Sequence, residues 1–327
     1  MPGLTILGTG SYSPPFALTN EMLESIVETS GEWITLRTGI AERKIAAETE
    51  STLSMATAAA LKAIGNIDKA SIGLVVCATI TPDYITPSLS CLLQRDLELR
   101  EDILAIDINC ACSGYVTALK TAHSLLADMP GRVALILGCE MLTRITDYTD
   151  RTTCILFGDG AGAAVIRRDS DGEFSFDSGA KGSVEMLACK AQYISNNPFM
   201  PRPLDLVPAG ITMNGQEVFR FAIETCSESV KRTLAGAGVD IGSVEHFIFH
   251  QANRRIIDGI VRKLGISTER CLINIATHGN TSSATCAIAL DDLFRSGKVK
   301  RGDKIIMSAF GGGLTYATAY FVQNREI

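Results

Sequence analysis

The sequence lacks a membrane-spanning run, an excess of positive charge and a secretion signal. No apolar stretch approaches the roughly 20 residues that a bilayer-spanning helix needs. The segment from Met1 to Leu7 has neither a basic n-region nor a long h-region. Lys and Arg number 30 against 36 Asp and Glu, which gives a net charge of −6, and a field of this sign repels nucleic acid. These absences predict a cytoplasmic protein with neither a membrane nor a nucleic acid as partner.

Clusters of metal ligands are also missing. Only four histidines are present, and none of the ten cysteines forms a Cys-x-x-Cys pair, so no zinc or other metal site is expected. Without a secretion signal, we favour buried reduced thiols over disulfides. Five cysteines lie in apolar runs typical of strands or helices: Cys77, Cys139, Cys154, Cys226 and Cys286.

What is present is a regular alternation of strand-like and helix-like segments. The chain has 327 residues, 46% of them hydrophobic and 20% charged, enough for a full core or two fused halves. The alternation predicts an α/β fold with mostly parallel sheets covered on both faces. The expected strands are Leu4–Gly8, Ile72–Ala78, Ile103–Ile108, Val133–Cys139, Ala161–Ile166, His246–His250, Cys271–Ile275, Lys304–Ala309 and Thr315–Val322; the expected helices are Asn20–Glu28, Thr52–Ile64, Tyr115–Leu126, Gly215–Ala235, Ile256–Leu264 and Ser283–Ser296.

A weak internal repeat divides the chain into residues 1–169 and 170–327. The strand–turn–helix pattern of Ile103–Leu126 returns at Leu272–Leu293. A strand, a Gly-rich turn and a second strand at Val133–Ile166 return at Lys304–Val322. No low-complexity linker separates the halves. The pattern predicts a duplicated α/β unit in one compact protein, with the ends of both halves meeting at one site.

The strand that begins at Ile103 leads into small residues and two cysteines just before an amphipathic helix. A cysteine at the start of a helix faces unpaired backbone N–H groups and the positive end of the helix dipole, and both favour the nucleophilic thiolate. Cys112 fits this place better than Cys110, which lies further back on the strand. The alternative is that both are small buried thiols that pack between sheet and helix.

Three further segments hold candidate partners for this thiol. His250 follows an apolar strand, where α/β folds place their sites, although a structural histidine fits equally well there; His246 and His123 are better explained as structural. Asn280 precedes a helix and either caps it or donates its amide to a substrate. The glycines Gly311–Gly313 form either a tight turn or, beside a thiolate, part of an oxyanion hole.

Four motifs together resemble one family. They are Cys112-Ser113-Gly114-Tyr115, His250-Gln251-Ala252-Asn253, Gly279-Asn280-Thr281-Ser282 and Phe310-Gly311-Gly312-Gly313. They are similar to motifs of β-ketoacyl-acyl carrier protein synthase III, the condensing enzyme that initiates bacterial fatty-acid synthesis, and the resemblance spans essentially the whole chain. It implies the thiolase fold, with two α/β halves in a five-layered α-β-α-β-α arrangement, and a homodimer.

The resemblance also implies a reaction. Cys112 would take an acyl group from acyl-CoA, and malonyl-acyl carrier protein would then lose carbon dioxide and attack the acyl-cysteine. His250 and Asn280 would donate hydrogen bonds to the enolate oxygen, and the N–H groups of Cys112 and Gly312 would form the oxyanion hole. Phe310 would keep the malonyl carboxylate poorly solvated. No permanently bound cofactor is implied, since acyl-CoA is a substrate.

Binding surfaces follow from the same resemblance. Trp33, Arg37, Arg151 and Asn253 correspond to coenzyme A contacts, with Trp33 and Arg151 on either side of the adenine, although Arg151 could equally pair with an aspartate. The position after Ile40, often basic in the family, is Ala41 here. The acidic carrier protein would dock on Arg220, Arg254, Arg255, Arg262 and Lys263.

The acyl pocket departs from the short-chain pattern at one position. Before Pro87, short-chain relatives carry a bulky aromatic that reaches the partner subunit's pocket, whereas this chain has Thr86. The smaller side chain favours a longer, branched or functionalised primer over acetyl. The alternative is that Tyr84 and the proline-rich segment from Met186 to Pro208, which could cap or line a pocket, refill this space.

Other functions stay open at this point. Related condensing enzymes of secondary metabolism or biotin-precursor synthesis use the same Cys, His and Asn with other primers. A thiol-dependent acyl-CoA hydrolase would instead pair Cys112 with His250 as general base. A noncatalytic partner fits least well, because the nucleophile and both donors are present.

Overall fold

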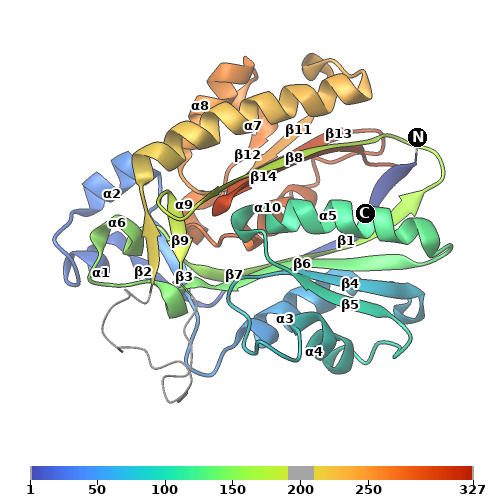
Figure 1. The fold of residues 1–327 in the computed structure, drawn as a ribbon, viewed down its shortest axis with the longest axis horizontal. Helices are drawn as coiled ribbons and strands as arrows, with labels where there is room; N and C mark the ends of the chain where they lie inside the picture. Colours follow the sequence, from blue (N-terminus) through green and yellow to red (C-terminus); the bar gives the residue numbers. More distant parts are fainter. Residues whose placement is uncertain (1, 191–209, 326–327) are drawn as a thin grey trace.

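The computed structural model describes residues 2–190 and 210–325, which form two five-stranded sheets and three layers of helices (Figure 1). The first sheet has the order β1 (Gly3–Tyr12), β7 (Asp159–Asp169), β6 (Val133–Met141), β4 (Ile72–Ala78) and β5 (Leu104–Ile108). The second has the order β12 (Cys271–Leu272), β11 (His246–Phe249), β13 (Lys304–Gly311), β14 (Gly313–Val322) and β8 (Phe174–Ser183). When the second order is read from its other end, β8, β14, β13, β11 and β12 occupy the places of β1, β7, β6, β4 and β5 in the first.

Helices cover both faces of each sheet, as Figure 1 shows. The central layer contains α5 (Gly114–Leu125) and α10 (Ala284–Arg295), whose apolar residues share one core with both sheets. The outer face of the first sheet packs against α3 (Thr52–Ile64) and α4 (Leu89–Asp96), and that of the second against α7 (Gly215–Ala237) and α8 (Arg254–Leu264). The layers therefore follow the order α-β-α-β-α.

Smaller elements surround the layers at one end. They are β2 (Phe16–Thr19) paired with β3 (Glu42–Ile45), β9 (Leu187–Cys189) paired with β10 (Ile211–Met213), and the short helices α1 (Asn20–Glu24), α2 (Gly31–Thr38), α6 (Arg151–Cys154) and α9 (Ile275–His278). No helix within residues 2–190 and 210–325 is long and apolar enough to cross a membrane.

The sheets are mixed, so the expectation of mostly parallel strands is wrong. The pairs of β4 with β5 and β6, and of β11 with β12 and β13, are parallel. The pairs β6–β7, β1–β7, β13–β14 and β14–β8 are antiparallel. The Gly-rich turn between β13 and β14 explains this, because a tight turn returns the chain antiparallel whereas a parallel strand needs a crossover.

Most predicted elements match within a few residues, and Thr52–Ile64 matches α3 at both ends. One strand is wrong: β12 ends at Leu272, and α9 begins at Ile275, where the predicted strand was to end. Elements α2, α4, β8 and the β2–β3 pair were not predicted, although the buried Leu89, Leu92 and Leu93 of α4 recur at helical spacing. The five cysteines predicted as buried thiols are buried and free.

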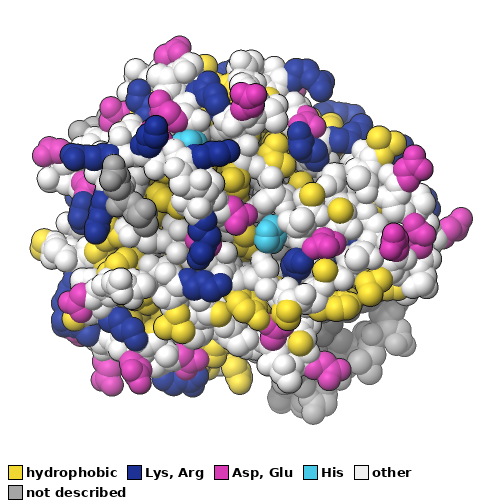
Figure 2. Space-filling model, turned by 180° about the vertical axis from the view of Figure 1, so that it is seen from behind, with side chains coloured by type: hydrophobic (Ala, Val, Ile, Leu, Met, Phe, Trp, Pro, Cys, Tyr) yellow, Lys and Arg dark blue, Asp and Glu magenta, His cyan; other side chains and the backbone are white. Residues whose placement is uncertain are grey.

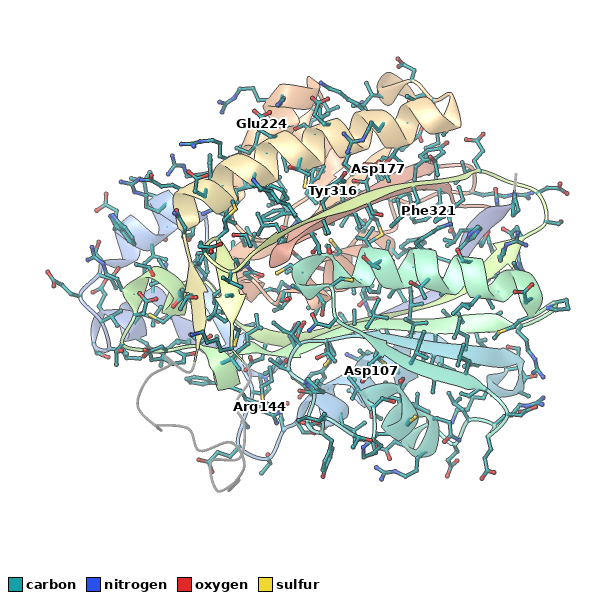
Figure 3. The ribbon with its side chains drawn as sticks, in the orientation of Figure 1. Asp107, Arg144, Asp177, Glu224, Tyr316 and Phe321 are labelled. Carbon is teal, nitrogen blue, oxygen red and sulfur yellow. The ribbon has the colours of Figure 1, made fainter. Side chains whose placement is uncertain are left out.

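Close packing of the central helix on the first sheet depends on Gly138 of β6. A Cβ at this position would lie 2.4 Å from the carbonyl oxygen of Ser283, just before α10. On the other sheet a polar contact joins helix and strand: Arg232 of α7 donates to Asp177 (2.7 Å) and to the Tyr316 hydroxyl (3.1 Å), both beneath the helix in Figure 3. These contacts fix the helices whose ends build the site.

Candidate active site

The candidate nucleophile lies in a sharp turn between β5 and α5. Cys112 is the middle residue of the 3-10 turn Ala111–Ser113 and is 8% exposed. Ala111 before it has φ 46°, in the left-handed region that residues with side chains rarely adopt. The Cys110 carbonyl accepts hydrogen bonds from the hydroxyls of Ser113 (2.8 Å) and Thr315 (3.1 Å). Cys110 thus holds the turn through its backbone, whereas the Cys112 thiol borders the cavity described below.

Burial raises the pKa of the Cys112 thiol to about 12. Hydrogen bonds with the Ser282 side chain and with backbone lower this pKa, while the nearby Glu140 raises it further. Loss of water outweighs the stabilising contacts, because a thiolate is poorly solvated in an apolar site. Burial therefore opposes the expected thiolate and favours the thiol in the free protein.

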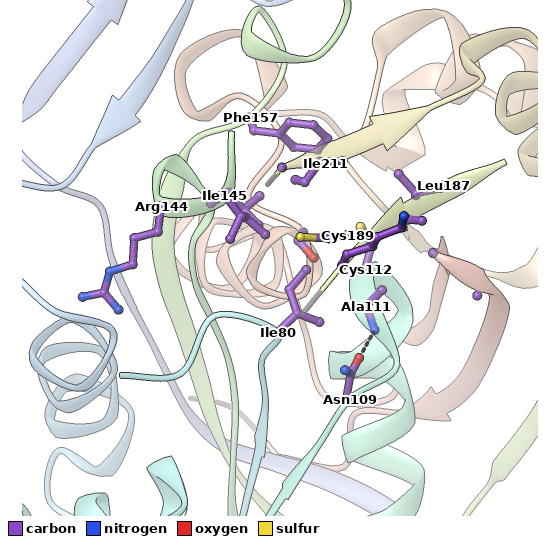
Figure 4. A pocket seen from close by; sticks show the side chains of 17 residues that line it. Ile80, Asn109, Ala111, Cys112, Arg144, Ile145, Phe157, Leu187, Cys189 and Ile211 are labelled. Carbon is purple, nitrogen blue, oxygen red and sulfur yellow. Dashed lines mark hydrogen bonds between the residues drawn. The ribbon is translucent and has the colours of Figure 1, made fainter. Parts of the chain in front are cut away.

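A cavity of about 590 Å³ opens beside Cys112. Apolar side chains dominate its wall, and Figure 4 shows Ile80, Ile145 and Phe157 around the thiol. The backbone of Gly312 and the side chain of Ser282 also line it. Of the segment 186–208, residues 187–190 contribute to the wall, and the part from 191 onward lies outside the described residues. The cavity suits an apolar acyl chain attached to the sulfur.

Asn280 lies beside this cavity in the loop before α10. Its backbone pairs with that of Phe157, a wall residue, and Gly158 N–H donates to its carbonyl at 3.0 Å. Its side-chain Oδ1 accepts a hydrogen bond from the Ser282 N–H at 2.9 Å. This contact identifies the amide oxygen and leaves the NH2 group as the donor. The predicted donor role is thus compatible with the geometry.

His250 follows the last residue of β11 and is 2% exposed. Burial lowers the pKa of its imidazole to about 3, so the ring is neutral at ordinary pH. Nδ1 lies 2.6 Å from the Thr285 hydroxyl, and the Phe310 ring packs edge-on at 5.1 Å. Because Thr285 bonds the carbonyl of the cavity residue Ser282 (2.9 Å), a short chain of contacts links His250 to the cavity wall.

The other two histidines considered above lie elsewhere. His246, at the start of β11, contacts Asp303 at 2.9 Å. His123 of α5 contacts the Gly3 carbonyl at 3.2 Å and stacks on Phe174. Both have local partners that account for their burial, which agrees with the structural roles predicted for them.

Gly311 and Gly312 bring β13 against the nucleophile turn. A Cβ at Gly311 would lie 2.6 Å from the Cys112 nitrogen, so only glycine permits this approach. Gly312 lines the same cavity as Cys112. The two backbone segments predicted to form an oxyanion hole are therefore adjacent, next to the sulfur.

Sequence reasoning missed Glu140, which is fully buried near the end of β6. Its carboxylate accepts hydrogen bonds from the Thr81 hydroxyl (2.6 Å), the Ser283 hydroxyl (2.8 Å) and the Ile80 N–H (3.0 Å), with longer ones from Thr79 and Ser282 (both 3.3 Å). Burial raises the pKa of this carboxyl, and the hydrogen bonds oppose the rise. The sequence did contain one signal for a buried polar group here. Glu140 is the one acidic residue in a nine-residue strand that is otherwise apolar or glycine.

The predicted coenzyme A contacts form one surface cluster. The guanidinium of Arg151 lies 5.6 Å from the centre of the Trp33 ring, and that of Arg37 lies 5.9 Å from it. The Asn253 amide donates to the Arg37 carbonyl at 3.1 Å, which joins α8 to α2. Arg151 also donates to the Glu28 carbonyl at 2.9 Å, so its recorded partner is a backbone oxygen and not an aspartate.

Two of the five predicted docking residues line a second groove, of about 520 Å³, between α2, α7 and α8. Arg220 and Arg255 line it together with Arg37. On α8, Arg255, Arg262 and Lys263 are exposed, as their helical spacing predicted. Acidic neighbours share this surface, and Figure 2 shows both signs interspersed over the back of the molecule. The recorded pairs are Arg220–Glu217, Arg254–Asp258 and Lys263–Glu224.

Thr86 lies apart from the cavity of its own chain. It is exposed, beside Tyr84 and Ile85, which are 57% and 97% exposed. It does not border the 590 Å³ cavity in the described part of the chain. Its predicted role as a gate to a partner subunit's pocket stays a prediction.

Comparisons with known proteins agree with the predicted fold. Family models described as 3-oxoacyl-[acyl-carrier-protein] synthase III and as its C-terminal part match residues 106–182 and 234–322. A β-ketoacyl-[acyl-carrier-protein] synthase III of Clostridium acetobutylicum is 41% identical over 322 residues, which cover 97% of this chain and 98% of that protein.

Solved structures are similar over the same length. The 3-oxoacyl-[acyl-carrier-protein] synthase III of Aquifex aeolicus has a TM-score of 0.89 at 41% identity, with 98% of this chain and 100% of that chain covered. The priming β-ketosynthase of the R1128 polyketide pathway has a TM-score of 0.89 at 33% identity, with 99% and 97% covered. The thiolase-fold prediction is confirmed.

Proposed function

Because the chain belongs to the β-ketoacyl-acyl carrier protein synthase III family, we propose that it joins an acyl-CoA primer to malonyl-acyl carrier protein through an acyl-Cys112 intermediate. It is an acyltransferase and condensing enzyme of fatty-acid synthesis. The observation that carries the residue assignment is the position of Cys112 beside an apolar cavity that Ser282 and Gly312 also line.

In the first half-reaction the Cys112 sulfur attacks the thioester carbon of acyl-CoA. A carbon–sulfur bond forms, the bond to coenzyme A breaks, and the departing thiolate takes the cysteine proton. The tetrahedral oxyanion accepts hydrogen bonds from the N–H groups of Cys112 and Gly312, and losing one such donor costs about a hundredfold in rate or more. Because the resting thiol has a pKa of about 12, acylation depends on moving that proton as coenzyme A leaves.

In the second half-reaction the malonyl group loses carbon dioxide, and the electron pair of the broken carbon–carbon bond forms an enolate. His250 and the Asn280 NH2 donate to the enolate oxygen. Both donors are neutral: Asn does not titrate, and the pKa of about 3 keeps His250 uncharged. The enolate carbon attacks acyl-Cys112, and the tetrahedral intermediate collapses to 3-oxoacyl-carrier and free Cys112, which regains one proton from water.

Two surface features support the substrates. Trp33, with Arg37 and Arg151 against its ring, offers an aromatic face and cations for the adenine and phosphates of coenzyme A. The groove lined by Arg37, Arg220 and Arg255 offers positive charge to the phosphopantetheine arm and acidic surface of the carrier.

The primer is larger than acetyl. The cavity volume of about 590 Å³ and its Ile- and Leu-rich wall favour a longer, branched or functionalised acyl chain, and Thr86 leaves more room in a partner's pocket than an aromatic residue would. A homodimer is supported by the edge strand β5, which within residues 2–190 and 210–325 pairs with β4 alone and where Leu104 is 39% exposed. Ten free thiols fit the reducing cytoplasm.

A second candidate is a priming condensing enzyme of a specialised pathway. The 33% identity to the R1128 priming β-ketosynthase favours it over unrelated chemistries. The two candidates share Cys112, His250 and Asn280 and differ in primer and carrier.

The test is the intact mass of the protein after exposure to acetyl-, isobutyryl-, octanoyl- and dicarboxylyl-CoA, followed by malonyl-acyl carrier protein. We expect one acyl adduct on Cys112, largest with a non-acetyl primer, and then carbon dioxide release with a 3-oxoacyl-carrier product. Cys110→Ala is the matched control and should keep the adduct, whereas Cys112→Ala should lose it. Acyl-CoA hydrolysis without malonyl-dependent carbon dioxide release would overturn the proposal in favour of a thiol hydrolase. A strict preference for acetyl-CoA would overturn only the proposal that the primer is larger than acetyl.

A further inference from the structure

The hydroxyl of Thr285 occupies a decisive place beside His250. Thr285 is the second residue of α10 and is 2% exposed. Its Oγ1 lies 2.6 Å from His250 Nδ1 and 2.9 Å from the Ser282 carbonyl oxygen. Within residues 2–190 and 210–325, this contact with Thr285 is the one hydrogen bond recorded for the imidazole. The direction of this hydrogen bond is therefore tied to which ring nitrogen carries the proton.

A neutral imidazole has one N–H and one acceptor nitrogen, and a hydroxyl has one hydrogen to donate. If Thr285 donates to the Ser282 carbonyl, it must accept from Nδ1–H, and Nε2 is then bare. If Thr285 donates to Nδ1, the ring proton is on Nε2. Only the second arrangement gives His250 a hydrogen to offer at Nε2.

We propose that Thr285 is a positioning residue that donates its hydroxyl hydrogen to Nδ1 and so keeps the His250 proton on Nε2, facing the enolate oxygen. The inference rests on the proposed condensing function for its consequence, although the tautomer itself can be measured without activity. It concerns decarboxylation and not the acylation of Cys112.

Three observations support this arrangement. The contact with Nδ1 is the shorter of the two, at 2.6 Å against 2.9 Å. The Ser282 carbonyl already accepts the Thr285 backbone N–H at 3.2 Å, so it does not depend on the hydroxyl. The Phe310 ring lies 5.1 Å from the imidazole at 68° to its plane, and its side chain carries no oxygen or nitrogen that could compete as an acceptor.

The other tautomer, with the proton on Nδ1, would oppose the reaction. A bare Nε2 would direct its lone pair at the enolate oxygen, which is gaining negative charge. Of the two proposed donors, His250 and Asn280, only the Asn280 NH2 would then remain. Losing a donor of this kind costs about a hundredfold. One hydroxyl hydrogen therefore controls whether the second half-reaction has both donors.

The test compares Thr285→Val with Thr285→Ser and with Thr121→Val as a matched control. Thr121 is a half-buried helical threonine of α5 whose hydroxyl donates to the Thr117 carbonyl at 2.9 Å. We expect Thr285→Val to lower malonyl-carrier decarboxylation about tenfold, as the loss of one buried hydrogen bond predicts. Acylation of Cys112 should change less than about threefold, and Thr285→Ser should restore decarboxylation.

Nitrogen-15 NMR of histidine-labelled protein gives the independent readout. The wild type should show a single His250 tautomer protonated at Nε2, and Thr285→Val should show a mixture. Protonation at Nδ1 in the wild type would overturn the proposal. So would a Thr285→Val protein that decarboxylates malonyl-carrier at the wild-type rate and shows the same His250 tautomer as the wild type. If the wild type neither acylates Cys112 nor condenses, the proposed function fails, while the NMR result still decides the role of Thr285.

Discussion

The two halves of the molecule place different chemistry at the same points of one scaffold. In the first sheet Ala78 and Gly138 are the last residues paired between β4 and β6, and in the second sheet Phe249 and Ser308 are the last paired between β11 and β13. Thr79 follows the first pair on its strand, and His250 follows the second. Equivalent strand ends thus carry a structural hydroxyl in one half and a candidate catalytic imidazole in the other.

The neighbouring strand repeats the contrast. Glu140 and Phe310 each lie two residues beyond the last paired position, on β6 and β13. Glu140 accepts hydrogen bonds from Thr79 and Thr81, so its charge is satisfied inside the protein. Phe310 carries no polar side-chain atom and packs against the His250 ring, whose hydrogen bond within the described residues is the Nδ1 contact with Thr285. The Glu140 carboxylate is thus surrounded by protein donors in one half, whereas the His250 ring in the other has a single hydrogen-bond partner among the described residues, which agrees with its proposed role as a donor to substrate.

The largest effect on activity should come from replacing His250 of the second half by threonine, the residue at the equivalent strand end of the first half. His250→Thr removes one of two donors to the enolate, so decarboxylation of malonyl-carrier should fall by about a hundredfold or more, while Cys112 acylation persists. Carbon dioxide release and intact mass measure the two steps separately. His246→Thr on the same strand is the control and should keep both. A His250→Thr protein with unchanged decarboxylation would contradict the assignment of His250.

Removing the buried Glu140 carboxylate should lower the stability of the protein. Glu140→Leu leaves the Thr81 hydroxyl and the Ile80 N–H without their acceptor, whereas Ser283 keeps the Ala78 carbonyl at 2.9 Å. The free energy of unfolding should therefore fall by about 4 kcal/mol. Urea denaturation measures it. Glu140→Gln retains one acceptor oxygen and should lose less. Equal stability of Glu140→Leu and the wild type would show that this carboxylate is not a support.

The sequence alone predicted Cys112, His250 and Asn280 as site residues: Cys112 and His250 follow apolar strands, Asn280 precedes a helix, and each belongs to a local motif. Glu140 was missed because its donors come from the loop after β4 (residues 79–81) and from the two residues just before α10 (residues 282–283), and no local spacing in the sequence predicts that these segments meet. The role of Thr285 depends on two distances around one hydroxyl. The resting thiol was missed because burial, which opposes the helix dipole, is a property of packing and not of the motif.

The buried His123 of the first half should make the stability of the protein depend on pH. His123 of the first half stacks on Phe174 at 4.1 Å, and its pKa is lowered by burial from 6.5 to about 4. Because the unfolded chain binds this proton below about pH 6.5 and the folded protein does not, stability is lost as pH falls from 6.5 towards about 4. His123→Gln, which can still donate to the Gly3 carbonyl, should reduce the loss between about pH 7 and about pH 5 by about 2 kcal/mol.

Urea unfolding of both proteins at the two pH values measures this difference. Condensing activity at about pH 7 should stay unchanged, because His123 lies outside the site. An identical acid loss in His123→Gln would show that other groups cause it.

The outer layers differ in charge as the inner strands differ in chemistry. On the first sheet α3 carries one basic residue, Lys62, whereas α8 on the second exposes Arg255, Arg262 and Lys263. Arg255→Glu reverses a charge in the groove shared with Arg37, so the KM for malonyl-acyl carrier protein should rise about tenfold at low salt and less at high salt. Lys62→Glu makes the same charge change on the other outer layer and should leave this KM unchanged. Equal effects of the two reversals would mean that the carrier senses net charge alone, whereas an effect confined to Arg255 would place the acidic carrier on the outer helices of the second half.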